Sequence, residues 1–228
     1  MCRATVIADW SFEASQPNGS GNTIAGIQAE DGVNAASSIA SGYHQNSSSW
    51  SSPSGDGTAH SFCANHSAVN DYFQFETSTI GFRDIEITFE QTSSSTGPSA
   101  FKLVYSTDGV KYLDFAGNGY TVGTTSWSST GPLKATILDF DLSSVAVLNN
   151  SVNVFFCLVD TSTANAGGTG SVGSSGTSRV DDFSINADSV VPVPEPAEQG
   201  LVAATLPLIL CSWLLWRLRG SQNSFTVT

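Results

Sequence analysis

Short runs in which apolar and polar residues alternate dominate the first 190 residues, and they limit what this chain can fold into. In DIEITFEQ (84–91) one face carries Ile85, Ile87 and Phe89, and the other carries Glu86, Thr88 and Glu90. A period of two is typical of a strand with one buried face. No segment of three turns shows the period of an amphipathic helix. The pattern therefore predicts an all-β fold.

Eight segments share this strand character, and two of them show how the strands are arranged. VNVFFCLV is apolar on both faces, which indicates a central strand in a two-sheet core. The Asp-Gly pair in STDG (106–109) suits a tight hairpin turn between its flanking strands. We predict a two-sheet antiparallel β-sandwich, jelly-roll-like, followed by a single C-terminal hydrophobic helix. The expected strands are 5–12, 72–77, 84–91, 100–106, 111–115, 133–142, 152–159 and 179–186, and a long loop is expected at 44–58.

The composition favours a protein that works outside the cell. The formal net charge is −12, with 8 Lys and Arg against 20 Asp and Glu, so the surface lacks the cationic patches that nucleic acids require. Ser, Thr, Gly and Asn fill the spaces between apolar runs, as is common in exported β-proteins. The start, MCRATVIADWSF, leads directly into a strand, so for an exported protein we expect a signal peptide encoded upstream of Met1.

The C-terminal part contains an apolar run, Leu201 to Trp216, after a Pro-rich segment and before two arginines. A run of this length nearly spans a bilayer core, and the arginines predict that its end stays cytoplasmic. A permanent anchor, a buried core helix and a removable sorting signal are the three interpretations. The expected divisions are a β-sandwich ectodomain (1–190), a Pro-rich linker (191–199), a transmembrane helix (200–219) and a polar tail (220–228).

The order of motifs in this segment resembles the PEP-CTERM sorting signal of bacterial exported proteins. The matching positions are Pro194, Glu195 and Pro196, followed by the apolar run and by Arg217 and Arg219. The runs DYFQFETS and RVDDFSIN also resemble the β-sandwich ectodomain of many such proteins. The resemblance implies processing by a membrane-embedded exosortase, a transpeptidase-like enzyme. It also implies transient anchoring in the inner membrane, followed by release to the cell surface or the extracellular polysaccharide matrix.

Four carboxylates lie in the first and last strands of the predicted sandwich: Asp9, Glu13, Asp181 and Asp182. Carboxylate oxygens are ligands that Ca²⁺ prefers, and a structural calcium is the only cofactor that the sequence suggests. Solvated edge residues are the alternative interpretation. Cys63 and Cys157 either form a disulfide or remain two buried free thiols.

Aromatic residues in polar loops offer a second kind of site. Trp50, Trp127, Tyr43 and Tyr120 could stack on the apolar face of a sugar, or could close the ends of the core. No nucleophile elbow is present, and the histidines all fall within 44–66. We therefore predict a non-catalytic surface or matrix protein. The alternative is a secreted carbohydrate-binding module or carbohydrate-active enzyme that uses the same sorting route.

Overall fold

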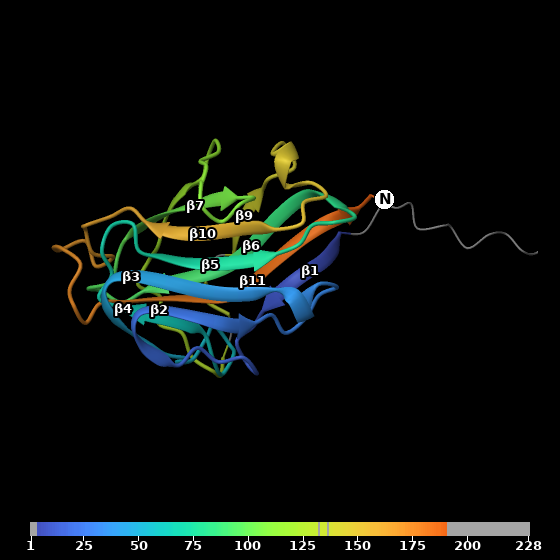
Figure 1. Cartoon of the computed structure of the whole chain (residues 1–228). Helices are drawn as coiled ribbons and strands as arrows, with labels where there is room; N and C mark the ends of the chain where they lie inside the picture. The colour runs from blue at the N-terminus through green and yellow to red at the C-terminus, as the bar shows by residue number, and fades with distance from the viewer. Residues whose placement is uncertain (1–3, 132, 136, 191–228) are drawn as a thin grey trace, which may run out of the picture. The chain divides into compact units, whose positions relative to one another are not determined.

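The computed structural model describes residues 4–131, 133–135 and 137–190, which form two antiparallel sheets packed face to face (Figure 1). The five-stranded sheet has the order β1-β11-β6-β9, and β4 also pairs with β11. Its strands are β1 (Thr5–Trp10), β4 (Phe62–Asn65), β6 (Phe82–Ser93), β9 (Leu138–Asp141) and β11 (Thr177–Ser189). The predicted all-β, two-sheet antiparallel architecture is confirmed.

The six-stranded sheet has the order β2-β3-β5-β10-β7-β8. Its strands are β2 (Gly19–Gln28), β3 (Ile39–Trp50), β5 (Tyr72–Thr77), β7 (Ala100–Ser106), β8 (Gly119–Thr121) and β10 (Val154–Asp160). Two single-turn 3₁₀ helices, η1 (Ala35–Ser37) and η2 (Ala146–Leu148), lie in connections. β10 lies between β5 and β7, which confirms that the doubly apolar run is a central strand.

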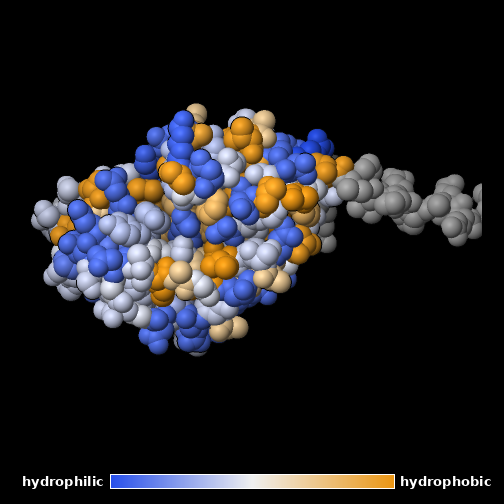
Figure 2. All heavy atoms as spheres, in the orientation of Figure 1, coloured by the Kyte–Doolittle hydropathy of each residue, from blue (hydrophilic) through white to orange (hydrophobic). Residues whose placement is uncertain are grey.

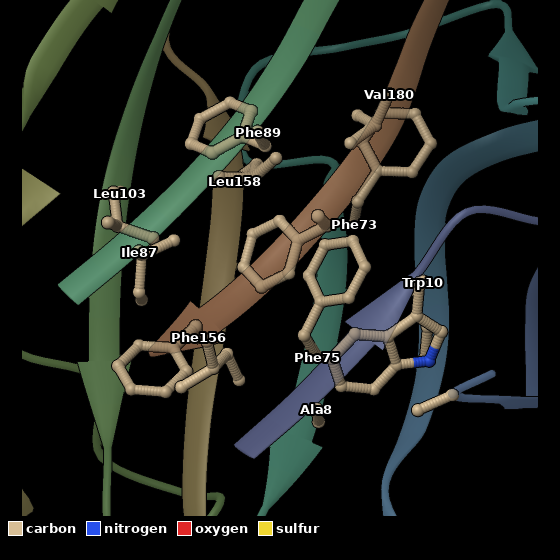
Figure 3. Packing of buried hydrophobic residues seen from close by; sticks show 14 of the residues in the cluster. Ala8, Trp10, Phe73, Phe75, Ile87, Phe89, Leu103, Phe156, Leu158 and Val180 are labelled. Carbon is tan, nitrogen blue, oxygen red and sulfur yellow. The ribbon is translucent and has the colours of Figure 1, made fainter. Parts of the chain in front are cut away.

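Aromatic rings from both sheets fill the space between them (Figure 3). Phe75 of β5 stacks on Phe183 of β11, with ring centroids 3.5 Å apart. Trp10 of β1 meets both rings edge-on, at 5.2 and 6.0 Å. Its buried indole N–H donates to the carbonyl of Ile27, 3.1 Å away, so the polar atom of this ring is satisfied. This cluster joins the two sheets at their centre.

Some strand predictions were wrong. The segment 44–50, expected in a loop, belongs to β3, because β2 and β3 pair along their length and Ser, Asn and Gln side chains occupy the exposed positions. The segment 111–115 is not a strand, since only Leu113 pairs there, with Tyr105. The expected strand 133–142 is reduced to β9. The strands β2, β3, β4 and β8 were not predicted.

The C-terminal predictions fall on residues that the structure does not describe. The expected helix 200–219 and the motif residues Pro194, Glu195, Pro196, Arg217 and Arg219 lie outside the described part of the chain. Within residues 4–131, 133–135 and 137–190, no helix has the length and apolar character needed to cross a bilayer.

The central ring stack predicts a large effect of truncation. Phe183→Ala should lower the free energy of unfolding by about 3–5 kcal/mol, because it removes a fully buried ring and leaves a cavity between the sheets. Chemical denaturation measures the change. Val110→Ala is the control, since Val110 is 84% exposed and its truncation should change stability by less than about 0.5 kcal/mol. Equal effects of the two substitutions would contradict this view of the core.

Candidate functional site

The outer face of the six-stranded sheet carries a row of side chains set by strand register. Tyr43 on β3 pairs with Tyr72 on β5, which pairs with Val159 on β10, which in turn pairs with Lys102 on β7. Alternate residues of a strand point to opposite faces, so these four side chains share the outer face while Phe73 and Leu158 enter the core. The Tyr43 and Tyr72 rings stack, with centroids 5.7 Å apart.

A groove of about 280 Å³ lies along this face. We call it the tyrosine groove; its lining residues are Asn70, Tyr72, Lys102, Val104, Tyr112, Asp114, Cys157 and Val159. Val104, Cys157 and Val159 are neighbours on two paired strands and make an apolar floor. Figure 2 shows the molecule in the orientation of Figure 1, with apolar residues dispersed among polar ones over that surface.

The second wall of the groove comes from the segment between β7 and β8. The Tyr112 hydroxyl donates to Gln74 Oε1 on β5, and the Cys157 thiol contacts the same oxygen at 3.5 Å. This bond holds the Tyr112 ring beside β10. Burial raises the pKa of the Tyr112 hydroxyl and raises that of the Cys157 thiol to about 12, so both stay protonated at neutral pH.

An ion pair lies among the residues that line the tyrosine groove. Lys102 Nζ lies 2.9 Å from Asp114 Oδ1. Hydrogen bonds from Lys102 and Asn118 lower the pKa of Asp114, which keeps its carboxylate ionised. The groove therefore combines an apolar floor, two aromatic walls and a few polar groups, a combination typical of small-ligand and sugar sites. Asp114 is the only carboxylic acid among the residues that line the groove, and its lowered pKa makes it a poor proton donor.

The two tryptophans considered for sugar stacking, Trp50 and Trp127, are both buried. Trp50 is 1% exposed, its ring packs on Phe62 and His44, and its N–H donates to the carbonyl of Gly21. Trp127 is 7% exposed, and the part of it that remains accessible lines a separate polar pocket with Thr92 and Arg179. Trp50 belongs to the hydrophobic core, as the alternative interpretation stated, whereas sugar stacking by Trp127 stays a prediction.

The two tyrosines of that prediction have different surroundings. The Tyr120 ring packs against Phe89, and its hydroxyl donates to Gln91, so it belongs to the core. Tyr43 is 38% exposed and lies beside the tyrosine groove, stacked on Tyr72. The sequence analysis missed Tyr72 and Tyr112. The alternation in YFQFET could have shown that Tyr72 faces away from the core.

The predicted disulfide between Cys63 and Cys157 is wrong. Cys63 lies on β4 in the five-stranded sheet, Cys157 lies on β10 in the other sheet, and both are buried free thiols. Burial raises the pKa of Cys63 as well. Neither thiol is activated as a nucleophile or as a metal ligand.

A cluster of acidic side chains forms on the outer side of the five-stranded sheet. Carboxylate oxygens of Glu90, Asp181 and Asp182 all lie within 4.8 Å of one another. Burial raises the pKa values of Asp9 and Asp182. Asp182 adds to the shift of Asp9, and Glu13 adds to that of Asp182. The structure thus brings the four predicted metal ligands into one region and adds Glu90, which the sequence analysis did not select.

A buried histidine–aspartate pair has a structural explanation. His44 Nδ1 lies 3.5 Å from Asp71 Oδ2 and 3.0 Å from the carbonyl of Asn65. The Asp71 carboxylate also accepts the backbone N–H groups of Gln45 and Ala68, each at 2.7 Å. Both side chains are 2% exposed, and burial lowers the pKa of His44. The pair fixes local backbone and is closed to a substrate.

No protein-family model and no curated protein matches the chain. The tandem CBM22-1–CBM22-2 domain of Paenibacillus barcinonensis Xyn10C is similar, with 13% identity and a TM-score of 0.45, over 88% of this chain and 49% of that one. The K1 cleaved adhesin domain of Porphyromonas gingivalis Lys-gingipain has 10% identity and a TM-score of 0.41, over 79% and 98%. This chain thus spans about half of the first structure. At these identities and TM-scores the likenesses say nothing about what it binds.

Asp160, at the end of β10, is a buried carboxylate with an unpartnered oxygen. Its Oδ1 accepts the N–H of Ser162 at 2.9 Å, while its Oδ2 has no hydrogen-bond partner. Burial raises its pKa from 3.8 to about 7, with a smaller contribution from Asp71. The folded protein therefore keeps a proton on Asp160 that the unfolded chain has already released above a pH of about 4.

This raised pKa predicts a pH-dependent stability. Between pH 4 and 7 the native state binds more protons at this site, so Asp160 makes the free energy of unfolding fall as the pH rises, by up to about 1.4 kcal/mol per pH unit. Asp160→Asn should lack this part of the slope. Urea denaturation of both proteins at several pH values measures it. A difference between them that stays constant over this range would contradict the raised pKa.

Proposed function

We propose that this protein is a non-catalytic, exported surface protein whose β-sandwich binds carbohydrate in the tyrosine groove. The observation that carries the proposal is that two tyrosine side chains, Tyr72 and Tyr112, line one groove together with an apolar floor. Sugars present apolar C–H faces and hydroxyl edges, so aromatic rings and isolated polar groups suit both of their surfaces.

The charge of the chain favours a neutral glycan. The formal net charge of −12 repels acidic polysaccharides, and the only cation lining the groove, Lys102, is already paired with Asp114. Asn70 and this ion pair supply hydrogen-bonding groups for sugar hydroxyls. This surface can bind a neutral, hydroxyl-rich ligand at a smaller free-energy cost of desolvation than a charged ligand.

Binding suits the groove better than hydrolysis does. Glycoside hydrolysis uses two carboxyl groups facing each other across the bond that breaks. Among the residues that line the groove, Asp114 is the single carboxylic acid, and its lowered pKa makes it a poor general acid.

Glycan-array binding followed by titration calorimetry tests the proposal with the full-length chain in mild detergent. We expect binding to neutral oligosaccharides and weaker or no binding to uronate-containing ones. Tyr72→Ala and Tyr112→Ala should each lower the affinity about tenfold or more, equivalent to about 1.4 kcal/mol, because each removes one wall of the groove.

Phe155→Ala is the matched control. Phe155 also lies on the outer face of β10, two residues before Cys157, but it does not line the groove. Its truncation should leave the affinity within about twofold. Thermal unfolding of each variant confirms that it is folded. Unchanged affinity of both tyrosine variants would exclude the tyrosine groove as the sugar site.

The second part of the proposal concerns export and sorting. Pro194, Glu195 and Pro196, the apolar run and the two arginines follow the β-sandwich in the order expected of a PEP-CTERM signal. We propose that an exosortase-type enzyme processes the chain near this motif, after transient anchoring in the inner membrane. A chain that binds glycans would then be released where extracellular polysaccharide is present.

Intact mass spectrometry of the cell-surface form tests the sorting route. Processing predicts a mature protein that lacks Arg217 and Arg219, and replacing Pro194, Glu195 and Pro196 with alanine should leave the C-terminal segment attached. A surface form that still carries Arg219 would support a permanent anchor instead.

A further inference from the structure

A β-bulge in β11 turns two consecutive acidic side chains toward the same side of the five-stranded sheet. Asp181 pairs with Glu90 of β6 and Ser184 pairs with Thr88, so β11 has one extra residue over this interval. Asp182 takes up the extra residue, with φ 46° in the left-handed region. Phe183 therefore returns to the core, while Asp181 and Asp182 both lie on the side of Glu90.

Glu90 reaches into this cluster with an oxygen that nothing satisfies. The residue is 4% exposed, and its Oε2 is buried without a hydrogen-bond partner. An unpaired buried carboxylate oxygen is costly, and polar groups of this kind normally meet a partner. Its acidic neighbours Asp56, Asp181 and Asp182 would repel it if all were ionised.

No cation of the described residues compensates the cluster. The ion pairs found in that part of the chain involve other carboxylates: Asp71, Asp84 and Asp114. Burial raises the pKa values of Glu90 and Asp181 to about 7 and also raises that of Asp182. Without a positive partner, these groups reach neutrality only by retaining protons.

We propose that Glu90, Asp181 and Asp182 form a binding site for a divalent cation, with Ca²⁺ as the favoured ion. Ca²⁺ takes carboxylate oxygens at about 2.3–2.6 Å, so two ligand oxygens on opposite sides of one ion lie about 5 Å apart. One carboxylate oxygen from each of the three residues lies within 4.8 Å of the other two, so a single ion can contact all three. An all-oxygen donor set favours Ca²⁺ over softer metals, and Asp182, only partly buried, leaves a route for entry.

The segment 55–58 packs against the acidic cluster, and this contact shows what the ion would stabilise. Asp181 Oδ2 accepts the hydroxyl of Thr58 at 2.7 Å and the N–H of Asp56 at 3.1 Å. Gly55 lies so close that an added Cβ would be 1.9 Å from Asp181 Oδ2. The bound ion would thus link β6, β11 and the segment 55–58, which lie far apart in the sequence.

Calcium titration of the full-length chain tests the site. The protein is stripped with EDTA and its thermal midpoint is followed as CaCl₂ or MgCl₂ is added, with calorimetry to measure affinity. At a free Ca²⁺ concentration about one hundred times Kd, we expect the midpoint to rise by about 5–10 °C, with a smaller rise for Mg²⁺. Glu90→Gln should remove the Ca²⁺-dependent rise and, without metal, unfold at a higher temperature than the unsubstituted chain.

Glu86→Gln is the matched control, because Glu86 lies four residues earlier on β6, beside the exposed acidic residues Asp139 and Asp141. It should keep the full Ca²⁺ response. Loss of the response in Glu86→Gln but not in Glu90→Gln would place the ion among those exposed residues and overturn the proposal. Equal midpoints with EDTA and with millimolar CaCl₂ would overturn it as well. Neither readout depends on sugar binding, so failure here leaves the proposed function standing.

Discussion

The contact between Phe75 and Phe183 is the constraint on which the rest of the structure depends. It joins the centre of the six-stranded sheet to the longest strand of the other sheet, and Trp10 fixes both rings edge-on. Side-chain packing of this kind sets the separation and angle of the two sheets, because the hydrogen-bond ladders between paired strands run within each sheet. Once these rings meet, strand alternation determines which side chains face outward.

The tyrosine groove and the acidic cluster are both formed by outward-facing side chains, but in different ways. On the six-stranded sheet regular alternation suffices: Tyr72, Cys157 and Val159 face outward because Phe73, Phe156 and Leu158 enter the core. On the five-stranded sheet the alternation is interrupted. Phe183 can reach Phe75 only after an extra residue has been taken up, and that same extra residue brings Asp181 and Asp182 together. The core contact and the acidic cluster are therefore consequences of one bulge.

The sequence predicts the fold class because the alternation of apolar and polar residues is a local property. The prediction fails where a segment becomes a strand only by pairing with another strand. The strands 72–77 and 100–106 have the predicted limits, whereas β3 extends through a polar run that only pairing with β2 makes a strand. For the sites, Asp181 and Asp182 could be selected as adjacent acids, but Glu90 could not, since its pairing with Asp181 depends on register. The spacing of Val180, Phe183 and Ile185 did contain a sign of the bulge. Trp50 and Trp127 are buried although their neighbours in the sequence are polar, because polar neighbours do not determine which way a ring points.

The two walls of the tyrosine groove differ in how they are built. Tyr72 is fixed by a central strand, whereas Tyr112 belongs to an irregular segment that pairs with β7 only at Leu113 and is held across the sheet by its hydroxyl bond to Gln74. Changes between Asp108 and Asn118 can reshape one wall without disturbing any strand of the sandwich. The shape of this wall can therefore diversify during evolution while the scaffold stays the same.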